Sequence, residues 1–311
     1  MHERLKALGE LFDRHVVGHT DVKHALLLGL VCREHLYLEG PPGSAKTRMA
    51  ELAARGSGLR FFFHQLHRDT RLPDLVGDVV LERRPLEGGA GERIAQRIEP
   101  GGILTSEVCV LDDLSRAPGE ALNVLLRVLN ERRFGDQPVP LLCAIATGNP
   151  PTDEYYNEPL DPATLDRFAL QLRVGSLLQT RQLEAARALL DGFARGAVEE
   201  RPELEPVLAR ADLDAAYAAL SGVDVPGPVK DALLELLRRL VVDHGCDESR
   251  ALLTDRSFLV KAVKLLRGQA LLAGRMRVLP EDLGVLERMT AFRVPAEVHA
   301  ALPGLIAGVL G

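Results

Sequence analysis

The 311-residue chain contains no tryptophan, and aromatic residues make up only 4% of it. Leucine, valine and alanine must therefore fill its core. No apolar run approaches the ~18 residues that a membrane-spanning helix needs, and the first residues lack the apolar centre of a signal peptide. We therefore expect no transmembrane helix, no membrane partner and a cytoplasmic location.

The cysteines form no CxxC pair, which gives no support to a zinc ribbon or a redox dithiol. Their wide spacing favours four buried free thiols, at Cys32, Cys109, Cys143 and Cys246. His64 and His67 lie three residues apart, but no cysteine or acid at ligand spacing completes a zinc site there. The sequence predicts neither a structural zinc site nor a disulfide framework.

Basic residues are outnumbered by acidic ones, and the formal net charge is −6. This balance argues against a dedicated nucleic-acid binder, because neutralising phosphates usually takes a basic surface. It leaves open a local basic lining in an assembled pore. The hydrophobic content of 46% and charged content of 26% are those of an ordinary globular protein.

Strand-like and helix-like segments alternate in the first half of the chain, which favours an α/β fold with a parallel sheet flanked by helices. The expected strands are residues 35–39, 59–65, 106–112, 140–147 and 168–174, and the expected helices are residues 20–33, 45–55 and 118–132. Residues 70–106 interrupt this alternation. Two β-rich stretches around the glycine-rich turn at 88–91 predict a hairpin inserted at about 77–98.

The strand signal fades after about residue 178, and strong helical patterns follow. Helices are predicted over 228–244, 255–273 and 280–289, with Thr254 as N-cap and Gly274 as the stop of the second. We therefore predict an α/β core over residues 1–175 and a smaller all-helical lid domain over 176–311.

The sharpest motif is Gly-Pro-Pro-Gly-Ser-Ala-Lys-Thr at residues 40–47, which follows a predicted strand and opens a predicted helix. This is the context of a P-loop, in which backbone N–H groups cradle phosphates, Lys46 reaches the β- and γ-phosphate oxygens and Thr47 binds Mg²⁺. The alternative is a Gly/Pro loop that merely ends a strand. The predicted ATP/ADP-binding residues of the loop are Gly40, Pro41, Pro42, Gly43, Ser44, Ala45, Lys46, Thr47 and Arg48.

Ala45 departs from the pattern, because glycine usually precedes the lysine of this loop. Since the position opens a helix, we expect right-handed backbone angles that suit alanine. Its methyl group would still lie close to the phosphates.

Residues 108–113 form an apolar strand that ends in two acids, the layout of a Walker B motif. Asp112 would hold Mg²⁺, and Asp113 would polarise the attacking water. Asp113 is one methylene shorter than the glutamate often found there, so slow hydrolysis is expected. The alternative is that Asp113 caps the following helix.

Leu-Asp-Asp-Leu-Ser-Arg-Ala-Pro at 111–118 resembles the Walker B segment of the MoxR family of AAA+ ATPases. Four further segments resemble that family in the same order: residues 129–132 (a helix end), 146–150 (sensor 1), 165–168 (the arginine-finger box) and 254–257 (sensor 2, especially of the RavA branch). The resemblance runs from about residue 15 to 293. It implies a P-loop AAA+ core with a helical lid.

The resemblance also implies roles for residues outside the two Walker motifs. Asn149 would orient the attacking water or touch the γ-phosphate; its alternative is a turn residue before a proline. Arg167 would reach into the neighbouring subunit's site; its alternative is a surface ion pair with Asp166. Arg256 would contact the γ-phosphate from the lid; its alternative is a surface residue at a helix start. Val17 and Gly18 would lie beside the adenine.

The function that follows from the resemblance is Mg-ATP hydrolysis at the subunit interfaces of a ring, expected to be hexameric, that remodels, assembles or activates a protein partner. The inserted hairpin would line the pore of this ring, and the partner could be a separate protein with a von Willebrand factor A domain. A nucleotide-gated ring scaffold with little hydrolysis is the alternative that Ala45 and Asp113 keep open. A DNA motor is a third, which the acidic balance disfavours.

Overall fold

The computed structural model describes residues 1–85, 92–150, 160–178, 182–194, 204–247 and 255–310. Its centre is a five-stranded sheet of order β2-β5-β8-β1-β9, in which every neighbouring pair is parallel. The strands are β1 (Leu36–Glu39), β2 (Phe61–Gln65), β5 (Val108–Asp112), β8 (Cys143–Gly148) and β9 (Leu170–Arg173). Four of them lie within the predicted strand segments and β8 extends one residue beyond its segment, and the predicted α/β class is confirmed.

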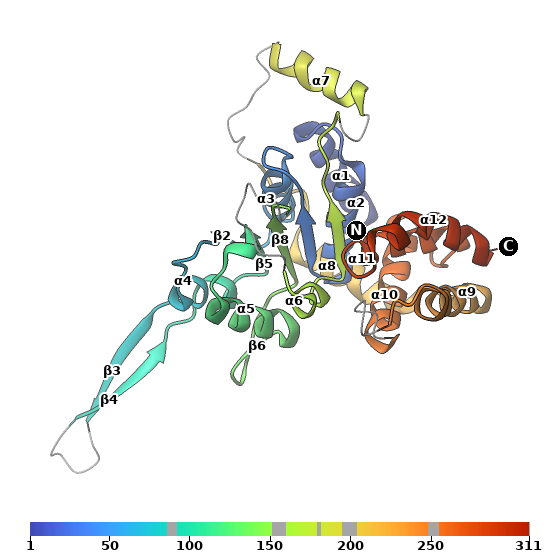
Figure 1. Cartoon of the computed structure of the whole chain (residues 1–311). Helices are drawn as coiled ribbons and strands as arrows, with labels where there is room; N and C mark the ends of the chain where they lie inside the picture. The colour runs from blue at the N-terminus through green and yellow to red at the C-terminus, as the bar shows by residue number, and fades with distance from the viewer. Residues whose placement is uncertain (86–91, 151–159, 179–181, 195–203, 248–254, 311) are drawn as a thin grey trace.

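Helices cover both faces of this sheet (Figure 1). They are α1 (His2–His15), α2 (Thr20–Cys32), α3 (Lys46–Gly56), α4 (Leu72–Val76), α5 (Gly119–Glu131) and α6 (Pro162–Asp166). Successive residues of β5 point to opposite faces: Val108 and Val110 pack with the apolar residues of α1, α2 and α3, whereas Cys109 and Leu111 pack with those of α5. Both sides of the central strands are therefore buried, which explains their nearly continuous apolar sequence.

A long hairpin of β3 (Val79–Pro85) and β4 (Glu92–Ile98) extends from the body of the protein (Figure 1). This confirms the predicted insertion, although its glycine-rich turn lies outside the described residues. Gly77 leads into the hairpin with a φ of 108°, and a Cβ there would lie 2.1 Å from the carbonyl oxygen of Glu99. Only glycine suits this combination of backbone angle and close approach.

The described residues beyond β9 are helical, apart from loops and one isolated bridge between Asp224 and Arg277. The elements are α7 (Leu183–Ala194), α8 (Arg210–Ala219), η3 (Leu220–Gly222), α9 (Gly227–Arg238), η4 (Arg239–Asp243), α10 (Asp255–Leu272), η5 (Pro280–Leu286), α11 (Glu287–Thr290) and α12 (Ala296–Leu310). The predicted helix over 280–289 is corrected to a 3₁₀ segment followed by a single α turn. Gly284 lies within it, and glycine disfavours a regular α-helix.

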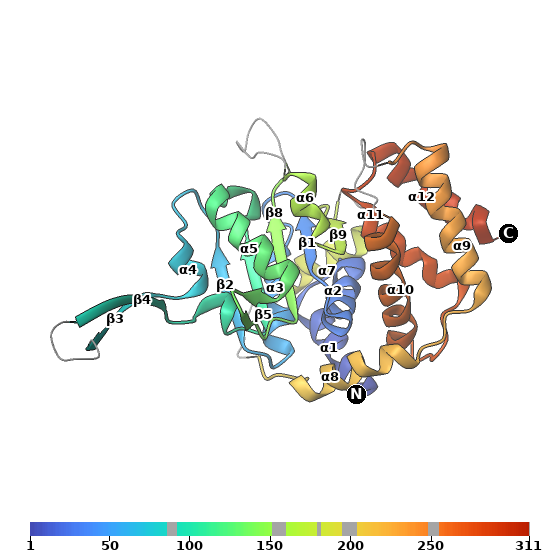
Figure 2. The same ribbon diagram turned by 90° about the horizontal axis from the view of Figure 1, so that it is seen from below.

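The helical second half packs closely against the α/β part. Helix α10 runs antiparallel to α2, since Lys264 lies by the end of α2 at Cys32 and Gln269 contacts His24 near its start (Figure 2). Helix α8 also contacts α2, and Arg210 pairs with Glu107 at 2.6 Å. One apolar cluster runs through both parts. The domain boundary at 175/176 stays a prediction.

None of the described helices combines the length and apolar character needed to cross a bilayer.

Candidate functional site

The loop at residues 40–47 joins the end of β1 to α3 and folds around its own lysine. The ammonium group of Lys46 donates to the carbonyl oxygens of Gly40 (2.6 Å) and Pro41 (2.9 Å) and to Asn149 Oδ1 (3.4 Å). Burial lowers the pKa of Lys46, and the negative charges of Asp112 and Asp113 oppose this shift. The loop thus holds one cation at the carboxyl edge of the sheet, facing two acids.

Ala45 does not have the right-handed backbone that its sequence position suggests. Its φ and ψ are 60° and 16°, in the left-handed region, so that expectation is wrong. The reason is that α3 begins one residue later, at Lys46, which makes Ala45 the non-helical N-cap. For a residue with a Cβ, this conformation costs about 1–2 kcal/mol. Strain of this kind is concentrated at ligand-binding segments.

Asp112 ends β5 and accepts hydrogen bonds from two hydroxyl groups. One comes from Thr47 Oγ1 at 2.8 Å, and the other comes from Thr147. A threonine hydroxyl beside a carboxylate supplies the hard oxygen ligands that Mg²⁺ prefers. The described residues contain no group of three or more His, Cys, Asp or Glu side chains placed to hold a metal ion. A cation here would have few protein ligands, as is usual for Mg²⁺ bound with phosphates.

Asp113 faces the same space as Lys46. Its Oδ1 accepts a hydrogen bond of 3.0 Å from Asn149 Nδ2, and its backbone N–H donates to Thr147 Oγ1 at 3.3 Å. Its side chain makes no capping hydrogen bond to the short helix η2 (Leu114–Arg116), so the capping alternative is not what the fold uses. Asn149 likewise bridges Lys46 and Asp113 rather than serving only its turn.

Two adjoining cavities meet at the loop. A polar cavity of about 410 Å³ is lined by the loop residues from Pro42 to Arg48 and by Asp112, Asp113, Thr147 and Asn149. A larger, mainly apolar cavity of about 950 Å³ is lined by residues before α2, including Val17, and by α7. Gly43, Ser44, Ala45 and Arg48 line both. The polar cavity has a lining that suits a phosphate chain, and the mainly apolar cavity has one that suits a nucleobase.

Gly18 packs closely against the segment around the start of α7. It has a φ of 75°, and a Cβ there would lie 2.6 Å from Gln182 Oε1 and 2.7 Å from Leu177 Cδ2. The same Gln182 oxygen accepts a hydrogen bond of 3.4 Å from the backbone N–H of His19. The predicted base-side residues thus lie where the second half of the chain meets the loop.

Arg167 lies at the opposite edge of the sheet from this loop. It precedes β9, whose first residue, Leu170, pairs with Leu36 at the start of β1. The P-loop follows the end of that strand, and four strand residues alone span ~13 Å. The side chain of Arg167 is 32% exposed and pairs with Asp166 at 3.5 Å. The structure therefore does not bring Arg167 to the P-loop of the same chain.

The structure does not bring Arg256 to that loop either. Helix α10 runs towards the P-loop edge only in its later turns, and Lys261 already reaches the carbonyl oxygen of Asp166. Arg256 is exposed and lies five residues earlier, ~7.5 Å further along the helix axis. It shares the amino edge of the sheet with Arg167. Thr254, the predicted N-cap, lies outside the described residues.

Sequence reasoning missed two groups at the loop. Thr147 joins Asp112 to the backbone of Asp113, yet it drew attention only as part of the segment before Asn149. Glu39 ends β1, and burial raises its pKa while Arg173 and Lys46 oppose the rise. Their positions at the carboxyl ends of predicted parallel strands are the signal that could have found both.

Three comparisons with known proteins bear on this site. A family model described as an AAA domain of the dynein-related subfamily matches residues 35–168. The chaperone MoxR1 of Mycobacterium tuberculosis is 27% identical over 298 residues, covering 91% of this chain and 73% of that protein. The uncharacterised protein YeaC of Bacillus subtilis is 25% identical over 300 residues, covering 93% and 86% respectively. A crystal structure of a candidate ATPase from Cytophaga hutchinsonii matches with a TM-score of 0.73 at 22% identity, covering 99% of this chain and 94% of that one.

A P-loop after β1 and an acidic pair after β5, on a parallel sheet of this order, define an AAA+ core, as the matching family model also indicates. The likeness to MoxR1 spans nearly the whole chain, and the structural likeness includes the helical second half. An AAA domain is matched within this chain, and nearly its whole length is similar to the chaperone MoxR1, so the chain resembles the MoxR family of AAA+ ATPases. Its placement in the RavA branch stays a prediction.

Proposed function

We propose that this chain binds Mg-ATP at residues 40–48 and hydrolyses it at the interfaces of a homo-oligomeric ring, expected to be hexameric, to remodel or activate a protein partner. The observation that carries this proposal is that the candidate catalytic side chains lie at two opposite edges of the sheet. Lys46, Asp113 and Asn149 are joined by hydrogen bonds at one edge of the sheet, whereas Arg167 lies at the other edge. A ring would bring the two edges of neighbouring subunits together.

In this proposal each side chain at the carboxyl edge has one task. Lys46 stabilises charge on the β- and γ-phosphate oxygens, and Thr47 with Asp112 holds Mg²⁺. When bound there, Mg²⁺ would supply positive charge close to the phosphate oxygens. Asn149 holds the carboxylate of Asp113 toward the polar cavity, where that carboxylate orients water and accepts its proton. Val17 and Gly18 border the base.

Arg167 would supply positive charge to the neighbouring subunit's γ-phosphate. An arginine supplied in this way is typically worth about 10³–10⁵ in turnover. Arg256 lies on the same edge, so its sensor role, if it touches a nucleotide, would also be exercised on the neighbour's nucleotide rather than on its own.

The protein partner is inferred from the family. The name of the relative MoxR1 describes a chaperone, which supports action on other proteins. The hairpin β3–β4 offers a surface for such a client, because Val79, Leu81 and Ile94 are all at least half exposed on one face of it. A separate protein with a von Willebrand factor A domain is the kind of partner that the family resemblance suggests.

The test is the ATPase rate per subunit measured against protein concentration. We expect the rate per subunit to rise with concentration, because the site is completed between chains. Lys46→Ala should abolish ATP binding, whereas Arg167→Ala should abolish turnover but keep binding. A wild-type rate that is independent of concentration and insensitive to Arg167→Ala would overturn hydrolysis in trans.

A second candidate is a nucleotide-gated scaffold that assembles on ATP and hydrolyses little. Two observations favour it: the short side chain of Asp113, which is already engaged by Asn149, and the left-handed Ala45, which places a methyl group in the loop. Wild-type turnover no higher than that of Lys46→Ala at every concentration, with ATP-dependent assembly intact, would select the scaffold.

A further inference from the structure

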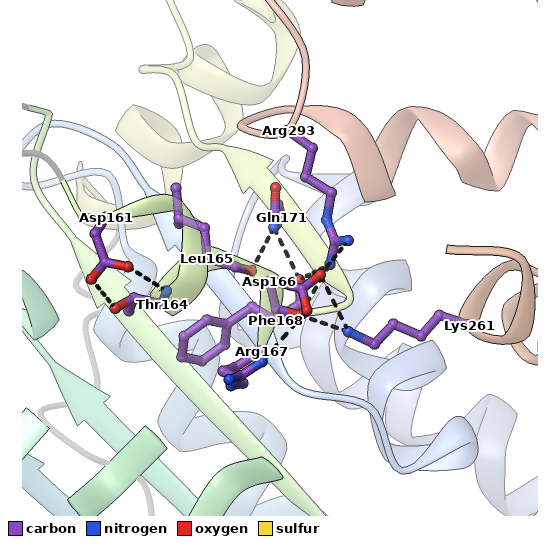
Figure 3. A network of polar contacts seen from close by, with 9 residues as sticks. All are labelled: Asp161, Thr164, Leu165, Asp166, Arg167, Phe168, Gln171, Lys261 and Arg293. Carbon is purple, nitrogen blue, oxygen red and sulfur yellow. Dashed lines mark hydrogen bonds and ion pairs between the residues drawn. The ribbon is translucent and has the colours of Figure 1, made fainter. Parts of the chain in front are cut away.

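Asp166, the residue immediately before Arg167, is surrounded by three cations from different parts of the chain (Figure 3). Its carboxylate lies 2.8 Å from Arg293 Nη1, 3.5 Å from Arg167 Nη1 and 3.8 Å from Lys261 Nζ. Arg293 therefore makes the close contact, and Arg167 is left with a longer one. Arg293 follows α11 and Lys261 belongs to α10, so both of these cations come from the helical second half.

The same two cations also hold the backbone on both sides of Arg167. Lys261 Nζ donates to the carbonyl oxygen of Asp166 at 2.6 Å, and Arg293 Nη2 donates to the carbonyl oxygens of Asp166 and Phe168, each at 3.2 Å. The carbonyl groups of the two residues that flank Arg167 are therefore fixed by side chains from distant parts of the chain. Figure 3 shows the side chains of Lys261 and Arg293 converging on this short segment.

Gln171 on β9 adds a third attachment. Its Nε2 donates to the carbonyl oxygens of Leu165 (2.8 Å) and Phe168 (3.0 Å), and its Oε1 accepts from the backbone N–H of Phe292 at 3.2 Å. Gln171 thus links the segment before β9 to the residue next to Arg293. The turn that presents Arg167 is therefore held by β9 and by the second half together.

Burial distinguishes Arg293 from Arg167. The side chain of Arg293 is 1% exposed, whereas that of Arg167 is 32% exposed. Burial lowers the pKa of Arg293, and Asp166 opposes that shift. Apolar residues of similar volume often stabilise a fold as well as a buried ion pair does. The buried guanidinium of Arg293 binds one carboxylate and two carbonyl groups. The geometry that these bonds impose explains its presence better than a contribution to stability does.

We propose that Arg293 and Lys261 are positioning residues for Arg167: they hold Asp166 and the adjoining backbone so that Arg167 stays free to reach a neighbouring subunit. The inference rests on the proposed trans hydrolysis. Without Arg293, the carboxylate of Asp166 would close on Arg167 and withdraw it. Movement of α10 and α11 would then change the rate of hydrolysis in the next subunit without touching its nucleotide.

The test compares Arg293→Gln with the double variant Asp166→Asn/Arg293→Gln in the assembled protein. Arg293→Gln should lower kcat by about 10–100-fold, since a misplacement of 1 Å can cost 10²-fold. The Kd for ATP should stay within about twofold, because the P-loop lies at the other edge of the sheet. Removing the competing carboxylate in the double variant should recover part of the lost kcat. Lys261→Met, which alters a less buried member, should lower kcat in the same direction by a smaller factor.

Arg275→Gln is the matched control. Arg275 also pairs with a buried acid of the second half, Asp282, at 2.7 and 2.9 Å, but it makes no contact with Asp166 among the described interactions. It should lower thermal stability and leave kcat unchanged. An unchanged kcat in Arg293→Gln and Lys261→Met would overturn the proposal, as would an equal loss in Arg275→Gln or a double variant without recovery. Wild-type kcat in Arg167→Ala would instead refute the proposed trans hydrolysis itself.

Discussion

The two edges of the sheet are organised in opposite ways. At the carboxyl edge, Lys46, Asp113 and Asn149 follow three strands that are neighbours in the sheet, and hydrogen bonds through Asn149 join them. At the amino edge, Arg167 is held through its neighbours by Lys261 of α10 and by Arg293, which follows α11. The first edge is local to the α/β part, whereas the second depends on the helical part.

This difference indicates how one chain can carry two separate parts of a site, each of which is incomplete without the other. The carboxyl edge has the groups that, in the proposed function, would bind phosphate and orient water, and it is assembled by the topology of a parallel sheet. The amino edge has a cation that cannot reach its own loop. Sheet topology alone fixes the first half, but the second requires the packing of the helical part.

The largest effect is expected from mixing the two inactive single variants, Lys46→Ala and Arg167→Ala. Each alone should lose about 10³-fold or more in turnover. In a 1:1 mixture that exchanges subunits, roughly a quarter of the interfaces would join an intact loop to an intact Arg167. Activity should recover to tens of per cent of the wild type, measured as phosphate release.

The control mixture pairs Lys46→Ala with the double variant Lys46→Ala/Arg167→Ala, which forms no complete interface. If the first mixture recovers no more activity than this one, the two edges do not act together.

Changes at Asp113 would sharpen the role of the carboxyl edge. Asp113→Asn should lower kcat by about 10²–10⁴-fold, the usual worth of a positioned general base. The Kd for ATP should change little, since Lys46 and the loop remain. Single-turnover hydrolysis with titrated ATP binding separates the two quantities. Asp113→Glu is the companion variant, and we expect it to equal or exceed the wild type; a loss as large as that of Asp113→Asn would show that the shorter side chain is required.

The backbone of the P-loop allows a smaller, matched test. Ala45→Gly should raise the free energy of unfolding by up to about 1.5 kcal/mol, because it relieves the left-handed strain of about 1–2 kcal/mol against a loss of about 0.4–1 kcal/mol to unfolded-chain entropy. Gly43→Ala places a methyl group at a φ of 81° in open space, and should lower it by up to about 1.5 kcal/mol after the same entropy term is counted with the opposite sign. Urea denaturation measures both. Changes of the same sign in the two variants would contradict this account.

An effect of similar size is expected from the pH dependence of stability at the amino edge of the sheet. His35 precedes β1, with its Nε2 donating to the carbonyl of Leu129 and its Nδ1 accepting from the N–H of Ala144, each at 2.9 Å. Burial, followed by the charge of Arg132, lowers its pKa to about 3. The unfolded chain therefore binds more protons between pH 3 and about 6.5, so stability is full above this range and falls as the pH falls.

Between pH 7.5 and 5.5, His35 alone should account for about 1.4 kcal/mol of lost stability. His35→Asn should be less stable at pH 7.5 but should lose about that much less on acidification. Urea titrations at the two pH values provide the measurement. An identical loss in both proteins would mean that His35 does not titrate on unfolding.

Periodicity and motif order predicted the sheet, the hairpin and most helices, because each depends on local pattern and on apolar burial. The Walker residues came together as expected, since consecutive parallel strands deliver their carboxyl ends to one edge. The backbone of Ala45 could not be read correctly, because it depends on where α3 begins, and one residue decides that.

The placement of Arg256 and the contacts of Arg293 and Lys261 with Asp166 could not be predicted from the sequence. Both depend on α10 packing antiparallel to α2, which is a tertiary choice made by contacts such as that between Gly268 and Cys32. The partners of Asp166 lie 95 and 127 positions away along the chain. No local pattern carries such a separation.

Because its four cysteines are buried, the native protein should react little with thiol-directed labels. Burial raises the pKa of each thiol, to about 12 for Cys143, so few thiolates are present near neutral pH. Exposed thiolates are the nucleophiles that attack maleimide reagents. A single cysteine introduced at the exposed Leu81 would therefore take up a fluorophore selectively, with all native cysteines left in place. The hairpin could then be followed by fluorescence while subunits associate.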